Sequence, residues 1–196
     1  SYPQEGGAIF LMKDQVREIH LDKDLVKDLD QQKLFGATHQ LFGKSGKAKR
    51  ISHSTCHGET NAGATTFQQA QLVAMRYTEL FMLRRWKHNL ALIGKVFETA
   101  AFVMPIDHIT DCGDYFDLCC GLKGVPADKT QRIAVLSMRE NRLSGRLRAF
   151  CWYPTYNIIV DALTKTGLFE ILMVLVSSGM WNHVRKDKRI KLRLIE

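Results

Sequence analysis

The stretch STCHGETNAGATTFQQAQLVAMRYTELFMLRRWKH, residues 54–88, has the pattern of a long helix, and the fold is predicted around it. Its side chains recur at helical spacing, with small residues first and large ones later. The residues at this spacing are Ala62, Ala64, Gln68, Leu72, Met75, Leu80 and Leu83. Thr55 can cap the N-terminus. Near the C-terminus, Arg84, Arg85, Lys87 and His88 suit the negative end of the helix dipole, and the same cations could equally contact phosphates.

Strand patterns precede this helix. GGAIFLM (6–12) is a short apolar run behind a glycine pair, and VREIHLD (16–22) alternates apolar with polar residues, so these two segments are predicted to pair as a hairpin. HQLF (39–42) indicates a further strand. GKSGKAKRIS (43–52) then places four cations on a predicted turn.

Helices and strands alternate after residue 88. NLALIGKVFETAAFVM (89–104) predicts a helix that stops at Pro105, and DHIT (107–110) predicts a short strand. Helices are predicted over 115–122 and 128–143, the latter with Ile133, Leu136 and Leu143 pointing inward. Leu147, Ala149 and Cys151 alternate with Arg146, Arg148 and Phe150, which predicts a strand that ends at Pro154. A further helix is predicted from NIIVDALTK (157–165).

The C-terminal part of the chain carries an apolar segment and a basic tail. LFEILMVLVSSGMW (168–181) contains Glu170 and is shorter than the roughly 20 residues that a membrane span requires, so a buried helix is the preferred interpretation. VRKDKRIKLRLIE (184–196) reads as a solvated tail by default. Because IKLRLI (190–195) alternates, an edge strand or docking arm is the other prediction for this tail.

The composition indicates a folded basic protein. The 196 residues suit one domain with extensions, and 45% of them are hydrophobic, which is enough for a packed core. The formal net charge of +8 favours polyanionic partners, nucleic acid first and an anionic membrane surface second.

Cysteine usage and the N-terminus bear on the compartment. The five cysteines, at 56, 112, 119, 120 and 151, form no CxxC pair, and an odd number does not suit a secreted disulfide framework. The start SYPQEGG has no signal-peptide pattern. We therefore expect an intracellular, reducing compartment.

Three kinds of chemistry compete for STCHGETNAG (54–63). A thiol nucleophile would need a base from elsewhere, because Cys56 and His57 are neighbours on a helix and point about 100° apart. Zinc is weakly supported, since His57-Gly58-Glu59 matches H-x-E but the P-C-x-x-C half of that signature is missing. The third reading is a carboxylate cluster for two divalent metal ions. Glu59, Asp111 and Asp161 each lie at the end of a predicted element, where each also has an ordinary role as a helix N-terminal charge or cap.

Three segments resemble one known family. KRISHSTCHGETNA (49–62), ITDCGDYFDL (109–118) and PTYNIIVDALTK (154–165) are similar to the ribonuclease H region at the C-terminal end of copia-type retrotransposon polyproteins. PTYNIIVDALTK is the most specific, although Val160 stands where the family usually has alanine. The resemblance covers about residues 6–166.

This resemblance implies a fold and a set of site residues. The fold would be α/β: a ribonuclease H-like mixed sheet with flanking helices over 1–166, with a C-terminal helix and basic tail over 167–196. Glu59, Asp111 and Asp161 match three of the family's four metal carboxylates, which would hold Mg²⁺ or Mn²⁺. The fourth belongs to the family's central first strand, and no DxD-like segment precedes GGAIFLM, so we expect that strand and its aspartate to be missing here. The cations expected to contact phosphates are Lys47, Lys49, Arg50, Arg84, Arg85 and Lys87.

Two functions follow as expectations. In the first, the chain is a retrotransposon-derived ribonuclease H-like domain, and its substrate, if it is active, is the RNA strand of an RNA–DNA hybrid. A partner chain, an upstream segment or the tail at 190–195 would complete the sheet. In the second, it is a non-catalytic structural or interaction subunit of a larger complex, which could be membrane-bound. The family implies the cytoplasm or the nucleus, and an organelle stays open.

Overall fold

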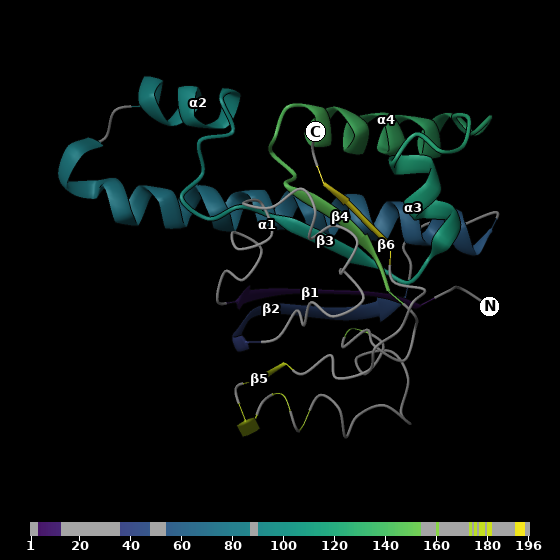
Figure 1. Cartoon of the computed structure of the whole chain (residues 1–196), viewed down its shortest axis with the longest axis horizontal. Helices are drawn as coiled ribbons and strands as arrows, with labels where there is room; N and C mark the ends of the chain where they lie inside the picture. The colour runs from purple at the N-terminus through teal and green to yellow at the C-terminus, as the bar shows by residue number, and fades with distance from the viewer. Residues whose placement is uncertain are drawn as a thin grey trace, which may run out of the picture. The chain divides into compact units, whose positions relative to one another are not determined.

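The protein has a mixed α/β structure of several helices and two small sheets (Figure 1). The computed structural model describes residues 4–12, 36–47, 54–86, 90–153 and 191–194, together with positions 160, 173, 175, 177, 178, 180 and 181. The chain divides into two compact units, one drawn from Ser1–Lys49 and Tyr153–Ile190 and the other from Arg50–Trp152 and Lys191–Glu196. The predicted α/β class is confirmed at this level.

The first unit is built on an antiparallel ribbon. Strand β1 (Gln4–Met12) pairs with strand β2 (Gly36–Lys47), from Gln4 opposite Lys47 to Met12 opposite Thr38. The register shifts between Ile9 and Phe10, which is where a β-bulge increases local twist. Strand β5 (Met180–Trp181) joins the other edge of β2.

Two predictions about this ribbon need correction. Residues 6–12 do form a strand, but its partner is 36–47, and the predicted partner 16–22 lies outside the described residues. Residues 43–47, predicted as part of a turn, continue β2, because the backbone of Gln4–Ala8 gives them a complete antiparallel partner.

The second unit contains a three-stranded mixed sheet. Strand β3 (Asp107–Thr110) runs parallel to strand β4 (Ala149–Trp152), and strand β6 (Lys191–Leu194) pairs with β4 in the antiparallel sense. The alternative prediction of an edge strand in the basic tail is therefore confirmed at Lys191–Leu194, and the default prediction of a solvated tail is wrong there. Strand β6 lies beside β4, and β3 is at the opposite edge of this three-stranded sheet. Among the described strands, the tail therefore does not fill the place next to β3.

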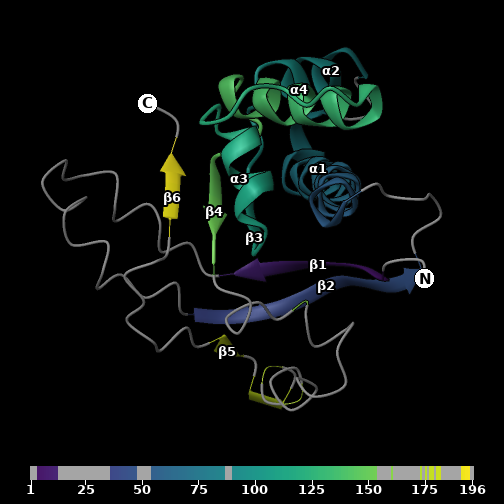
Figure 2. The same cartoon turned by 90° about the vertical axis from the view of Figure 1, so that its right-hand side faces the viewer.

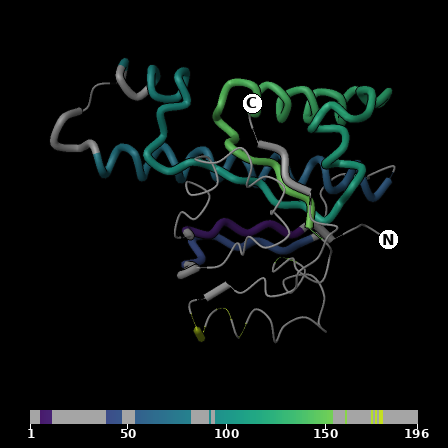
Figure 3. The backbone as a smooth tube through the Cα atoms, viewed as in Figure 1, coloured from purple at the N-terminus to yellow at the C-terminus, as the bar shows by residue number. Residues whose placement is uncertain are grey.

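Helices cover one face of this sheet (Figure 2). Helix α1 (Thr55–Trp86) confirms the predicted long helix, and the chain then returns through helix α2 (Leu90–Glu98), as the tube in Figure 3 shows. Helix α2 is shorter than the predicted 89–104. The chain leaves the helix at Ala100, which has a left-handed φ of 54°, and Val103 N–H then donates to Thr78 Oγ1 at 3.0 Å. Helices α3 (Gly113–Cys119) and α4 (Lys129–Leu143) form the connection from β3 to β4.

Helix α4 is oriented differently from the prediction. Ile133, Leu136 and Leu143 were expected inward but are exposed, whereas Gln131, Val135, Met138 and Asn141 are buried. The buried polar residues are satisfied within the unit: Gln71 Nε2 of α1 donates to Asn141 Oδ1 at 2.9 Å. Because burying a polar group is tolerated when it is hydrogen-bonded, this pairing allows α4 to present a partly polar face to α1.

The core of the second unit joins α1, α3, α4 and the sheet. Its fully buried members include Phe67, Tyr115, Phe116, Val135, Met138, Leu147 and Phe150. Phe150, which shares its side of the predicted alternation with Arg146 and Arg148, is 0% exposed, because β4 is buried on both faces. Strands of a parallel pair that is buried on both faces do not show a regular apolar–polar alternation, so the pattern does not identify which side chains are buried.

The apolar segment near the C-terminus is described at a few positions. Residues 173, 175, 177 and 178 are helical, with Leu175 buried and Met173 exposed, and residues 180–181 form β5 where the helix was predicted to continue. Within the described residues, no helix has both the length and the hydropathy needed to cross a membrane.

Candidate functional site

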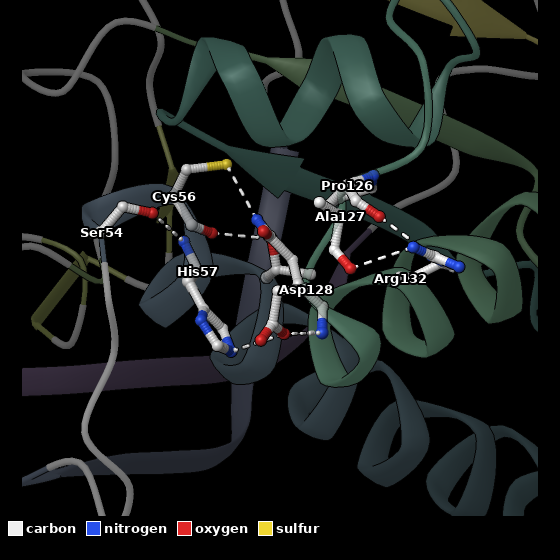
Figure 4. Close-up of polar contacts among 9 residues, drawn as sticks. Ser54, Cys56, His57, Pro126, Ala127, Asp128 and Arg132 are labelled. Carbon is white, nitrogen blue, oxygen red and sulfur yellow. Dashed lines mark hydrogen bonds and ion pairs between the residues drawn. The ribbon is translucent and has the colours of Figure 1, made fainter.

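The first turns of α1 hold the most chemically diverse cluster of the chain. The N-cap is Ser54 and not the predicted Thr55: Ser54 Oγ accepts the His57 N–H at 3.1 Å (Figure 4). The Thr60 hydroxyl donates to the Cys56 carbonyl at 2.7 Å. The helix start is therefore fixed by two hydroxyl groups next to the residues whose chemistry is in question.

A polar network connects this turn to the start of α4. Gln131 Nε2 donates to Cys56 Sγ at 3.4 Å and to Thr60 Oγ1 at 3.3 Å. Asp128 caps α4 by accepting the Gln131 N–H at 2.8 Å, and its Oδ1 lies 3.8 Å from His57 Nε2. Figure 4 shows His57 directed at Asp128, with the Cys56 thiol on the other side of the turn. Cys56 and His57 thus have separate partners, as expected for neighbours on a helix.

The end of β3 meets the same region. Asp111 directly follows β3 and is half-buried, and its carbonyl oxygen accepts the Trp152 indole N–H at 2.8 Å, which ties the end of β3 to the end of β4. The next residue, Cys112, is the N-cap of α3, and its N–H donates to Thr110 Oγ1 at 3.1 Å. The backbone around Asp111 is therefore held on both sides.

Glu59 contributes to the electrostatics of the residues that follow β3. Burial raises the pKa of the Cys112 thiol to about 12, and the charges of Cys56 and Glu59 act in the same direction. Burial also raises the pKa of Tyr115 well above its usual value, and Glu59 again contributes. One carboxylate on α1 therefore acts on Cys112 and Tyr115, which lie one and four positions after Asp111.

The thiols of this region are poor nucleophiles. At neutral pH the Cys112 thiol stays protonated, and burial likewise raises the pKa of Cys119 above its ordinary range. Since the thiolate is the reactive form, these two side chains are better described as packing residues. All five cysteines are reduced.

Two of the three predicted carboxylates are described by the structure, and one of them, Glu59, acts electrostatically on the residue that follows the other, Asp111. Glu59 and Asp111 are both half-buried, and Asp161 lies outside the described residues. Among the residues that the structure describes, no group of three or more His, Cys, Asp or Glu side chains gathers around a common point as a metal site would require. The described residues alone therefore do not fit a divalent metal ion.

The predicted phosphate contacts are only partly placed. Lys47 ends β2, and Arg84 and Arg85 lie in the last turn of α1, where the structure describes their backbone. Lys49, Arg50 and Lys87 lie outside the described residues.

Sequence reasoning missed three residues of this region, Asp128, Gln131 and Trp152. A signal existed for the first two, because Asp128 followed three positions later by Gln131 is a capping-box pattern at a helix start. Trp152 had no such signal, since only the parallel pairing of β3 with β4 brings its indole to Asp111.

No protein-family model, curated protein or solved structure matches the chain.

Proposed function

We propose that the chain is a ribonuclease H-like domain of retrotransposon origin that acts on RNA–DNA hybrids. The observation that carries the proposal is that Glu59, on the second turn of α1, acts electrostatically on Cys112, the residue that follows Asp111 at the end of β3. These two acids come from separate motifs of the resemblance, KRISHSTCHGETNA and ITDCGDYFDL. The electrostatic effect of Glu59 on a residue of the second motif supports treating the motifs as parts of one site.

The order of elements supports the same proposal. An antiparallel ribbon, a long helix, a short helix, a strand, two helices and a second strand parallel to the preceding one follow one another along the chain. Strands with flanking helices are what the resemblance implies. Parallel strands need a helical crossover, which α3 and α4 provide between β3 and β4.

The third acid of the site would be Asp161. In the proposal, Glu59, Asp111 and Asp161 supply hard oxygen ligands for Mg²⁺ or Mn²⁺, ions that would activate water and stabilise the leaving oxygen during phosphodiester hydrolysis. The described residues gather no three-ligand group, so a metal ion would need Asp161 as well as Glu59 and Asp111. The net charge of +8, with Lys47, Arg84 and Arg85 among the cations, would attract the phosphate backbone.

A non-catalytic interaction subunit is the second candidate. It is favoured by large apolar side chains left exposed on α1 and α4: Leu72, Leu80, Phe81, Ile133, Leu136 and Leu143. Contiguous exposed apolar surface often marks a protein–protein contact.

The test is cleavage of a labelled RNA–DNA hybrid in Mg²⁺ or Mn²⁺. We expect Glu59→Gln and Asp111→Asn each to reduce cleavage by about 100-fold or more, the usual loss when a group that acts at the reacting atoms is removed. Glu79→Gln is the matched control, because Glu79 lies on the same helix, pairs with Arg76 at 2.7 Å, and is about 30 Å from Glu59 at 1.5 Å per residue. Equal cleavage by all these proteins would contradict the proposal. Hybrid binding without cleavage would favour the second candidate.

A further inference from the structure

Helix α4 has an outward apolar face that the second unit does not use. Ile133, Leu136 and Leu143 are 59%, 46% and 75% exposed, while Val135 and Met138 of the same helix are buried against α1 and α3. Figures 1 and 2 both show α4 at the outside of this unit, with α1 on its inner side. We call Lys129, Ile133, Leu136, Glu140 and Leu143 the α4 outer stripe.

The loop before α4 adds apolar surface beside the stripe. Arg132 donates to the carbonyls of Pro126 and Ala127 at 3.0 and 2.9 Å, and Arg139 donates to those of Leu118 and Lys123 at 2.7 Å each. The two arginines thus fasten the loop along one side of the helix. Leu122 and Val125 of this loop are 52% and 45% exposed.

The spacing of the stripe is that of a helix–helix seam. Its five residues are separated by four, three, four and three positions, which is the a and d pattern of a heptad repeat. On an α-helix these positions fall within about 80° of one another at 100° per residue. A second helix can therefore lie along the whole stripe.

The charges of the stripe identify the partner. Lys129 and Glu140 are equally far from the midpoint between Ile133 and Leu136, and they have opposite signs. When a copy of α4 lies antiparallel about this midpoint, Ile133 faces Leu136 twice and Lys129 faces Glu140 twice. A parallel copy would instead place Lys129 against Lys129 and Glu140 against Glu140.

We propose that the α4 outer stripe is the contact of an antiparallel homodimer with twofold symmetry. An interface with twofold symmetry requires a surface that is complementary to a second copy of itself. The α4 outer stripe is self-complementary at both its apolar and its charged positions. One helix and a neighbouring loop make a small interface, so the dimer should be concentration-dependent. The inference is independent of the proposed function, because Glu59 and Asp111 lie outside the stripe.

Sedimentation or light scattering of the whole chain tests the proposal. From about 1 µM to several hundred µM, at about 0.15 M salt to screen the repulsion between two +8 chains, the mass should rise from monomer to dimer. Leu136→Glu should abolish this rise. Leu72→Glu, at a 50% exposed leucine of α1, should leave it unchanged.

A charge exchange tests the antiparallel register. Lys129→Glu and Glu140→Lys should each weaken self-association by about tenfold or more, because each replaces two attractive contacts with two repulsive ones. Mixing the two variants should restore dimers, since positions 129 and 140 then carry opposite charges in both of the pairs that cross the interface. Circular dichroism confirms folding of each variant.

Two results would overturn the proposal. One is a monomer at every concentration with wild-type protein. The other is a dimer that Leu136→Glu does not affect, or that mixing the two charge variants fails to restore, since either shows that another surface or register is used.

Discussion

Gly63 sets how closely α1 and α3 can approach. A Cβ at this position would lie 2.6 Å from both Cε1 and the hydroxyl oxygen of Tyr115, a side chain that is fully buried. A rigid ring in a packed core cannot move aside easily, so the extra methyl group forces strain. The glycine is therefore required by packing, in spite of its low helix propensity.

We expect Gly63→Ala to lower the free energy of unfolding by about 1 kcal/mol or more. Overpacking costs about 1–3 kcal/mol and the gain in helix propensity is about 1 kcal/mol, so a cost in the middle of that range leaves a net loss of about 1 kcal/mol. Gly94→Ala in α2 is the control, because no atom lies within 4 Å of its Cβ position and the change should stabilise the protein slightly. Urea unfolding measures both, and a Gly63→Ala protein as stable as the wild type would refute the packing argument.

His108 should make stability depend on pH. Its ring stacks on Phe150 at 4.9 Å and meets the edge of Tyr115 at 5.8 Å, and burial lowers its pKa from 6.5 to about 4. Between these values the unfolded chain binds a proton that the folded chain does not, so stability falls as the pH decreases from about 6.5 towards 4.

The expected contribution of His108 is a loss of about 2 kcal/mol between pH 7 and pH 5, at 1.36 kcal/mol per pKa unit. His108→Phe keeps an aromatic ring and cannot be protonated, so it should remove this part of the pH dependence. Urea unfolding of both proteins at the two pH values gives the comparison. The same pH dependence in both would show that other groups cause it.

At the scale of elements, α4 shows where sequence patterns fail. The helix was predicted over nearly its observed limits, but Ile133, Leu136 and Leu143 were assigned to the core as the apolar face of an amphipathic helix. The helix carries two apolar faces, and Gln71 with Asn141 decides which one packs inward. A hydrogen bond between side chains 70 positions apart leaves no local signal in either segment. By contrast, α1, β1, β3 and β6 follow from local periodicity alone.

The α4 N-cap should contribute measurably to stability. Asp128→Ala removes the acceptor of the Gln131 N–H, which typically costs about 1 kcal/mol. Asp128→Asn keeps an acceptor for the cap and loses the charge that faces His57, so it should cost much less. Thermal or urea unfolding of the two variants measures the loss of stability in each. Equal losses would assign the effect to the contact with His57 instead of the cap.

Strand β6 should protect the backbone amides of β4 from hydrogen exchange with solvent. Cys151 pairs with Leu192, and a proline at 192 would disrupt the ladder, whereas alanine would keep its backbone groups. We expect faster amide hydrogen exchange at Phe150–Trp152 in Leu192→Pro than in Leu192→Ala. Unchanged exchange in the proline variant would show that β4 does not depend on this pairing.

At the scale of the whole molecule, the sequence predicts the class of the fold better than its assembly. The strand and helix patterns and the family resemblance indicate an α/β protein, and a mixed α/β structure is what is observed. The pairing of β1 with residues 36–47, and of β4 with residues 191–194, depends on contacts between distant segments. Such pairings are not visible in local periodicity. For the candidate site, the motifs predicted Glu59 and Asp111, and a capping-box pattern marked Asp128 and Gln131, whereas Trp152 comes to Asp111 only through the pairing of β3 with β4.

The proposed function requires Glu59 and Asp111 to bind divalent metal ions, with Asp161 as the third acid. Mn²⁺ is paramagnetic and can replace Mg²⁺ at oxygen ligands, so it broadens the NMR signals of nearby amides. We expect selective broadening at residues 59, 111 and 161 and their neighbours, lost in Glu59→Gln and kept in Glu79→Gln. Broadening confined to other residues, or unchanged in Glu59→Gln, would contradict it.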